Sequence, residues 1–407
     1  MPHEIINLNN HIKLIHKEIK SPVSHLGVLV NAGTRDEAEN LSGIAHFVEH
    51  TIFKGTTRRK GYQVIRRMED VGGDINASTS KEETWFHSSF LSADYQRAVE
   101  LLADIFFHAT FPEKELEKEK DVVYEEIKYY RDTPSELIFD EIEEQVFNGH
   151  PLGRAVLGSK KSVKSIKRDD ILSFIQQNYT NPYVVISSAG DISTKKLTDL
   201  CNHYFGTQEL VVTHRDREAF TNYQPKNVVK HKNTNQTHLI ISTPAYSLYD
   251  DNRHVFMLIA NLLGGQGMNT RLNMAIREKL GLAYTVEASY TPYTDTGLFS
   301  IYAGCDNNYW QKCIDLSFKE IDKLKKTKLG TMQMHYARKQ FLGQLAIAQE
   351  SKLHEMLSIG RSALFYDQVD TIEETIAQIE SITAEQIWEV ANQIFVTDHF
   401  STLIYTK

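Results

Sequence analysis

The segment HLGVLVNAG at residues 25–33 decides the fold, because HLIISTPAY at 238–246 repeats its pattern in the second half of the chain. Both segments contain short apolar runs, which predict buried strands. A helical stretch follows each segment, at 42–54 after the first and at 255–263 after the second. Gly55 stands where a glycine commonly ends a helix. The sequence therefore predicts two copies of one α+β unit.

Weaker patterns extend this order of elements along the chain. They predict an entry strand in the first twenty residues, helices at 64–71, 94–108 and 112–131, strands at 83–91 and 183–189, a helix ending at Gly281, strands through Ala303, and helices over most of the remainder. The polar stretch at 207–235 is weakly patterned, so we place a domain boundary near residue 220. The expected fold class is α+β, with two related domains in tandem, 1–220 and 221–407. Each is expected to hold an antiparallel-rich sheet flanked by helices.

The composition excludes several classes of protein. The chain has 407 residues, of which 41% are hydrophobic, and this suits packed globular domains. Its net charge of −8 argues against a nucleic-acid partner, whose binding sites are basic. The charge is compatible with a solvated acidic surface and also with an acidic cavity that favours basic peptides. Three cysteines without close pairs do not form a disulfide framework or a cysteine-rich zinc site.

The N-terminal sequence MPHEIINLNNHIKLIHKEIK contains no apolar core of a secretory signal. No stretch of the chain approaches the roughly 20 apolar residues of a membrane-spanning helix. We therefore expect a cytoplasmic protein without a membrane partner.

The segment LSGIAHFVEHTIFKG at 41–55 places chemistry on the first of the repeated helices. His46 and His50 are four residues apart, so they share one helix face and can hold one metal ion. Glu49 projects beside them. The surrounding positions are nearly all apolar, and burying two imidazoles and a carboxylate without partners is costly. The alternative is a helix with surface histidines and a salt-bridged glutamate.

A third ligand is expected from another rigid element, because catalytic zinc usually has three protein ligands and one open position. On the helix at 112–131 one stripe contains Leu116, Glu119, Val123, Glu126 and Tyr130, whereas Glu117 and Glu125 fall on the opposite side. Two carboxylates within an apolar stripe are unusual for a solvated helix. We predict Glu126 as the third ligand and Glu119 as the group that orients a ligand, although periodicity alone does not decide this assignment.

Three segments of the first half resemble those of the pitrilysin/insulinase-type inverzincin metallopeptidases: HFVEH at 46–50, VGGDINASTSKEET at 71–84 and LEKEKDVVYEEIKYYRDTP at 116–134. The chain is most similar to the short subgroup that includes mitochondrial processing peptidase and the bacterial processing-protease-like proteins. The segment GGQGMNTRLNMAIREKLGLAYTV at 264–286 is similar to the second domain of that subgroup. The glycine-rich loop of the family is only partly present, as Gly-Gly-Gln-Gly at 264–267.

The resemblance implies one zinc ion per chain, bound by His46, His50 and Glu126. It implies that Glu49 is the general base acting on a zinc-bound water, and that Glu119 is the family's additional acid. The second copy of the repeat carries VFMLIANLLG where the first carries the histidine motif, so it cannot bind metal in the same way.

Other site residues rest on the resemblance alone. Arg277 is similar in position to the family's substrate-orienting arginine, and Tyr284 to its oxyanion-stabilising tyrosine. Asn76 and Ala77 lie in DINAST, which resembles the strand whose edge receives the substrate backbone. The alternatives are an ordinary surface arginine, a packed strand tyrosine and a plain edge strand.

The function expected from these features is a zinc-dependent endopeptidase that cleaves extended or unfolded peptides. The family encloses its substrates in a clamshell of four domains, and a chain of this length supplies two of them, which is half of a clamshell. A homodimer is therefore expected. Two alternatives remain, a catalytically silent scaffold or binding subunit of the same family and a metal-dependent hydrolase of small amides.

Overall fold

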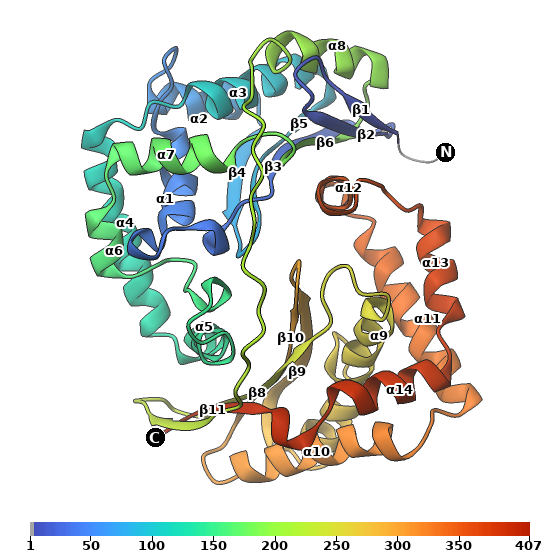
Figure 1. Ribbon diagram of the computed structural model, residues 1–407. Helices are drawn as coiled ribbons and strands as arrows, with labels where there is room; N and C mark the ends of the chain where they lie inside the picture. Colours follow the sequence, from blue (N-terminus) through green and yellow to red (C-terminus); the bar gives the residue numbers. More distant parts are fainter. Residues whose placement is uncertain (1–3) are drawn as a thin grey trace. The chain divides into compact units, whose positions relative to one another are not determined.

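The chain folds into two units, each assembled from separate segments (Figure 1). The computed structural model describes residues 4–407, so the first three residues of the predicted entry segment lie outside the described residues. The first unit comprises Met1–Ile127, Arg154–Arg217 and Ile347–Thr371, and the second comprises Lys128–Gly153, Glu218–Ala346 and Ile372–Lys407. The continuous domains predicted at 1–220 and 221–407 differ from this division at 128–153 and 347–371. Each of these two segments packs with the sheet of the other half of the sequence.

The first unit is built on a six-stranded mixed sheet in the order β1-β2-β6-β3-β5-β4. The strands are β1 (Ile5–Asn7), β2 (Lys13–Glu18), β3 (Val23–Val30), β4 (Asp74–Thr79), β5 (Thr84–Leu91) and β6 (Val184–Gly190). β2 and β6 are parallel, and the other neighbours are antiparallel. β3 and β6 lie in the centre of the sheet and are almost entirely buried, whereas β4 is an edge strand.

The second unit repeats the same topology in five strands, in the order β7-β11-β8-β10-β9. The strands are β7 (Asn227–His231), β8 (Thr237–Ala245), β9 (Ala283–Pro292), β10 (Gly297–Cys305) and β11 (Ser401–Thr406). β7 and β11 are parallel, and the remaining neighbours are antiparallel. Strands β7 to β11 therefore correspond in order and direction to β2 to β6, and the predicted strands at 25–33 and 238–246 are the equivalent strands β3 and β8.

The helices occur in the same order in the two halves of the sequence. Those of the first half are α1 (Ile44–Thr51), α2 (Gly61–Glu69), α3 (Tyr95–His108), α4 (Glu113–Arg131), α5 (Pro134–Val146), α6 (Lys160–Ser165), α7 (Arg168–Asn178) and α8 (Thr194–Tyr204). Those of the second half are α9 (Arg253–Gly264), a π-helical segment (Asn273–Glu278), α10 (Trp310–Lys326), α11 (Thr331–Ala348), α12 (Lys352–Tyr366), α13 (Ile372–Ser381) and α14 (Ala384–Ile394). Short 3₁₀ turns lie at Thr34–Asp36, Glu39–Leu41, Ile52–Lys54, Ser92–Asp94, Pro151–Gly153 and Thr397–His399.

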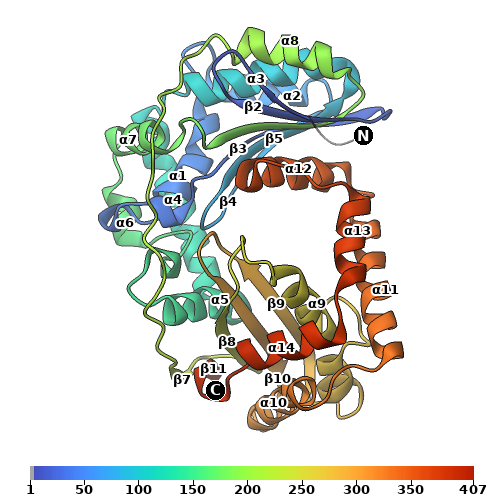
Figure 2. The same ribbon diagram turned by 45° about the vertical axis from the view of Figure 1, so that its right-hand side comes forward.

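Helices cover both faces of the first sheet (Figure 2). α1, α3 and α8 pack against one side, and α12 packs against β2, β3 and β6 on the other. The approach of α12 is close: a Cβ atom on Gly360 would lie 2.7 Å from Cβ of Ser187 and 2.9 Å from Cδ2 of Leu29. Ile359 and Ala363 of α12 join Ile15 and Val185 in a buried cluster.

The second sheet is covered in the same manner, and α5 takes the place that α12 has on the first sheet. Ile138 and Ile142 of α5 pack in a cluster that includes Ile240 of β8. The neighbouring residues Leu239 and Ile241 belong to the larger cluster formed with α9, α10 and α14. This alternation follows from the period of two in a strand. α5 and α12 occupy equivalent positions in the two repeats, so each covers the sheet formed mainly by the other repeat.

Local signals predicted several element boundaries. The helix predicted at 42–54 is α1 followed by the 3₁₀ turn Ile52–Lys54, and it begins only after Gly43, whose φ is +92°. The helix predicted to end at Gly281 is the π-helical segment, and Gly281 has a φ of +61°. Cys201, Cys305 and Cys313 are buried free thiols. Within residues 4–407 no helix combines the length and the apolarity needed to cross a membrane.

Candidate functional site

α1 presents His46 and His50 on one face, as their spacing predicts. The other face is apolar, with Ile44, Phe47 and Val48 fully buried. Burial of that face fixes the rotation of the helix and therefore the direction of both imidazoles. The ring centroids of His46 and His50 lie 4.5 Å apart, with an angle of 63° between the ring planes.

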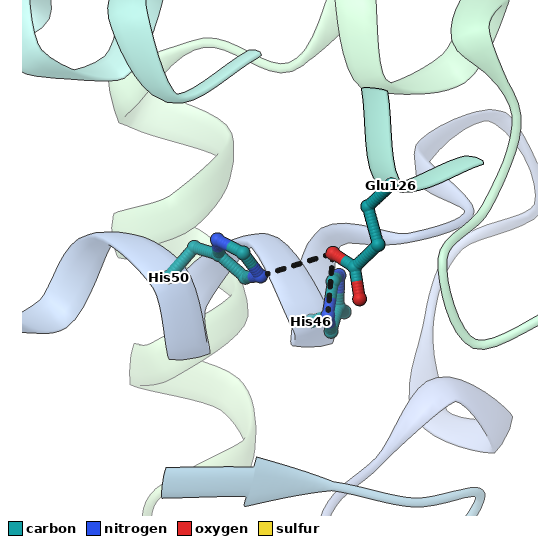
Figure 3. A group of neighbouring side chains, drawn as sticks. All are labelled: His46, His50 and Glu126. Atoms are coloured by element: carbon teal, nitrogen blue, oxygen red, sulfur yellow. Dashed lines mark ion pairs between the residues drawn. The ribbon is translucent and has the colours of Figure 1, made fainter. Parts of the chain in front are cut away.

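α4 brings Glu126 to the two histidines (Figure 3). The Oε2 atom of Glu126 lies 3.3 Å from Nε2 of His50 and 3.7 Å from Nε2 of His46. Potential ligand atoms of the three side chains all lie within 4.8 Å of one another. Leu116 and Val123 of the predicted stripe are buried, whereas Glu125 points to solvent. This orientation of α4 aims Glu126, and not Glu125, at α1.

Glu119 lies behind His50, and each of its two carboxylate oxygens contacts a different basic side chain. Its Oε1 atom is 3.0 Å from Nδ1 of His50, and its Oε2 atom is 2.6 Å from Nζ of Lys54. The contact to Nδ1 leaves Nε2 of His50 directed at Glu126. A carboxylate that holds the second ring nitrogen in this way fixes the orientation and raises the basicity of a ligating histidine.

The two histidines differ in their electrostatic environments. Burial lowers the pKa of His46, and the nearby His50 lowers it further. Burial also opposes the charge on His50, but the hydrogen bond with Glu119 and the negative charges of Glu126 and Glu119 outweigh it and raise the pKa of His50 to about 9. In the absence of metal, these two carboxylates therefore favour the protonated form of His50.

The arrangement fits a zinc ion. Two imidazoles and one carboxylate are a known ligand set for catalytic zinc, which leaves one position open. Oε2 of Glu126 is buried between the two ring nitrogens and makes no hydrogen bond within residues 4–407. A buried oxygen without a hydrogen bond is stabilised by a cation. Among the described residues this is the one group of at least three histidine, cysteine or acidic side chains with such ligand spacing.

Glu49 lies between His46 and His50 on α1 and is half-buried. Burial raises its pKa above the ordinary glutamate value, although the side chain and backbone of Thr79 and the charge of His50 act in the opposite direction. A carboxylate with a raised pKa is a better general base at neutral pH than an exposed one.

The predicted substrate-binding residues lie on the edge strand β4. Asn76 is paired across the sheet with His87, and Ala77 with Phe86. Within the described residues β4 pairs only with β5, so its other edge offers backbone groups that could pair with an extended peptide. Thr79, which interacts with Glu49, ends this same strand.

Arg277 and Tyr284 belong to the second unit. Arg277 lies in the π-helical segment, and Tyr284 lies near the start of β9 with 83% of its surface exposed. The exposed Tyr284 side chain does not have the packed environment of the alternative interpretation. The roles of both residues stay predictions that rest on the resemblance.

Two residues near the candidate metal site were not predicted from the sequence. Lys54 lies four residues after His50 and so shares its side of the helix end, a spacing that could have revealed it as the partner of Glu119. Glu37 accepts hydrogen bonds from the first turn of α1. No spacing rule signals Glu37, because it acts from outside the helix.

The chain is similar to known proteins along most of its length. Residues 13–160 match the family described as Insulinase (Peptidase family M16), and residues 165–341 match the Peptidase M16 inactive domain. The zinc protease YmxG of Bacillus subtilis is 32% identical over 379 residues, which cover 93% of this chain and 92% of YmxG. A zinc protease of Rickettsia felis is 32% identical over 382 residues, which cover 93% of this chain and 91% of the relative.

Solved structures share the fold along the whole chain. A protease from Helicobacter pylori has a TM-score of 0.91 at 21% identity, with 100% of both chains covered. A peptidase M16 inactive domain from Pseudomonas fluorescens has a TM-score of 0.92 at 21% identity, with 100% of this chain and 98% of that chain covered. These likenesses confirm the predicted class of two tandem α+β domains. The match of both halves to the family models, together with relatives above 30% identity over nine-tenths of the sequence, shows that the chain belongs to the insulinase family of zinc proteases, peptidase family M16.

Proposed function

We propose that the chain is a zinc-dependent endopeptidase that cleaves extended or unfolded peptides. The observation that carries the proposal is the convergence of His46, His50 and Glu126, with Glu49 beside them on α1. The ligand set suits one zinc ion per chain and leaves a coordination position for the reaction.

The residues of this chain divide the chemistry between them. When bound, zinc supplies the Lewis acidity that activates water and polarises a peptide carbonyl. Glu49 takes a proton from the attacking water onto its carboxylate and delivers that proton to the leaving amine. Glu119 holds Nδ1 of His50, so that His50 keeps its orientation through the reaction.

The substrate is proposed to bind as an added strand along β4, with its backbone at Asn76 and Ala77. Backbone pairing depends little on the side chains of the peptide. It requires an extended segment, so unfolded peptides are favoured over folded proteins. Arg277 is proposed to orient the substrate, and Tyr284 to donate a hydrogen bond to the oxyanion.

A homodimer is proposed from the size of the chain and the four-domain clamshell of the family. In that assembly Tyr284 of one chain serves the metal site of the other. Co-expression of Glu49→Gln with Tyr284→Phe tests this, because a mixed dimer regains one complete site. With random pairing the activity should recover to about a quarter of wild type. No recovery in a preparation shown by tagged pull-down to contain mixed dimers would contradict the arrangement.

Metal removal tests the proposed activity itself. An unstructured peptide should be cleaved by the zinc-loaded chain, cleavage should stop with a chelator, and added zinc should restore it. A chain that is fully loaded with zinc but does not cleave peptides would be a silent scaffold or binding subunit. Cleavage of small amides without cleavage of peptides would indicate the small-amide hydrolase.

A further inference from the structure

The metal-binding helix α1 begins without a capping side chain of its own. Its N-cap residue is Gly43, which has a φ of +92° and has no side chain that could accept a hydrogen bond. A Cβ atom at this position would lie 2.7 Å from the carbonyl oxygen of Leu157. The serine, threonine or aspartate that usually caps a helix therefore cannot occupy position 43.

Glu37 supplies the missing cap from outside the helix. Its Oε2 atom accepts a hydrogen bond from the amide of Gly43, and its Oε1 atom accepts one from the amide of Ala45, both at 2.9 Å. The first amides of a helix have no partner within the helix, so an external acceptor must satisfy them when they are buried. One side chain thus accepts hydrogen bonds from two amides of the first turn. One of these amides belongs to Ala45, the residue immediately before His46.

Glu37 is itself held in place by the surrounding chain. Its side chain is buried, and its carbonyl oxygen accepts a 2.5 Å hydrogen bond from Nη1 of Arg154. The carbonyl oxygen of Arg154 in turn accepts a hydrogen bond from Nζ of Lys81. The contacts run from Lys81 through Arg154 and Glu37 to the start of α1, so the position of the helix end depends on a fixed carboxylate.

We propose that Glu37 is a positioning residue for the metal site, which sets the first turn of α1 and thereby the placement of His46 against His50 and Glu126. The inference rests on the proposed zinc function. Glu37 acts through the two backbone amides, and it is not a ligand. Its effect should therefore appear in metal affinity and in coordination geometry, and not only in the stability of the fold.

A glutamine at position 37 has nearly the same shape as the native glutamate. It can therefore separate an effect on metal binding from an effect on the stability of the fold. A carboxyl group can accept with both oxygens, whereas glutamine has one acceptor oxygen and one donor nitrogen. The amide that meets the donor nitrogen loses its partner, and the first turn must shift to satisfy it. The exposed Glu39, two residues further on, provides the matched control, Glu39→Gln.

The experiment measures the zinc dissociation constant of the full chain by competition with a chromophoric chelator. The visible absorption spectrum of the cobalt-substituted chain reports coordination geometry, and the melting temperature of the metal-free chain reports the fold. Changes in groups that orient metal ligands typically weaken binding about 10- to 100-fold. For Glu37→Gln we expect zinc binding at least about 10-fold weaker and an altered cobalt spectrum, with Glu39→Gln matching wild type.

Several outcomes would overturn the inference or its premise. A Glu37→Gln chain with a lower melting temperature but unchanged zinc affinity and cobalt spectrum would make Glu37 a structural cap only. If Glu37→Gln does not fold, Glu37→Asp decides, since its shorter carboxylate cannot reach both amides unless the turn moves. Unchanged zinc affinity in Glu37→Asp would then reject the role. A wild-type chain that binds no zinc would instead reject the proposed function.

Discussion

The two repeats of the chain share a topology but differ in what their first helices carry. α1 lies between β3 and β4, and α9 lies at the equivalent place between β8 and β9. α1 reads IAHFVEHT, with two potential ligands and a potential base, whereas α9 reads RHVFMLIANLLG and has no acidic residue. Both bury an apolar face against their own sheet. The fold therefore needs only the apolar face of each of these helices. The candidate metal site uses positions on the other face of α1, which packing does not require to be apolar.

The helices α4 and α11 show the same contrast. α4 contributes Glu119 and Glu126 to the site, while α11, its equivalent in the second repeat, contains no aspartate or glutamate in its 18 residues. The second repeat thus lacks the counterparts of both the α1 residues and the α4 residues of the candidate site. If the comparison is right, all tight zinc binding and all proton transfer by this chain depend on the first repeat.

Replacement of the proposed general base, Glu49, should have the largest effect. In Glu49→Gln we expect peptide cleavage to fall by about 10²- to 10⁴-fold, the usual contribution of a general base, because the amide cannot accept the proton. The zinc content should stay at the wild-type level. Metal analysis and initial rates on one purified sample check both points, with the exposed Glu69→Gln as the control. Loss of zinc together with activity would mean that Glu49 is a ligand.

Removal of the proposed third ligand, Glu126, should have the next largest effect. In Glu126→Ala we expect zinc affinity to fall by more than about 100-fold, beyond the range typical of groups that only orient a ligand. In the neighbouring Glu125→Ala it should not change, because that side chain points to solvent. Chelator competition measures both. If Glu126→Ala still bound one zinc ion tightly, a second site would exist and the contrast between the repeats would fail.

Much of the site follows from the sequence because its geometry is local. A spacing of four places His46 and His50 on one helix face, and the stripe of α4 separates Glu126 from Glu125 in the structure as it does in the sequence. The repeat was predictable for the same reason, since β3 and β8 have similar apolar patterns. Arg277 and Tyr284 were predicted from family resemblance alone, because no periodicity relates them to the proposed metal ligands.

The exchange of α5 and α12 could not be predicted. An apolar helix face shows that a helix packs, but it does not show which of two similar sheets receives it. The cap of α1 could not be predicted for a related reason. Glu37 lies outside the helix, and its role depends on the left-handed backbone conformation of Gly43, where there is no room for a side chain. Both features depend on contacts that a pattern along the chain does not encode.

The exchange itself is open to a smaller and sharper test, which compares two helical glycines of the second half. A Cβ atom on Gly360 of α12 would meet Ser187 and Leu29 of the first sheet at less than 3 Å, whereas one on Gly343 of α11 would meet nothing within 4 Å. Overpacking typically lowers the free energy of unfolding by about 1–3 kcal/mol, so Gly360→Ala should be destabilised by that amount. Gly343→Ala should instead be more stable by about 0.4–1 kcal/mol, because alanine restricts the unfolded chain and favours the helix.

The two variants carry the same chemical change, so helix propensity cancels between them and the difference in their free energies of unfolding reports the packing of α12. Denaturant unfolding of both variants measures it. Equal stability of the two variants would contradict the close packing of α12 against β3 and β6.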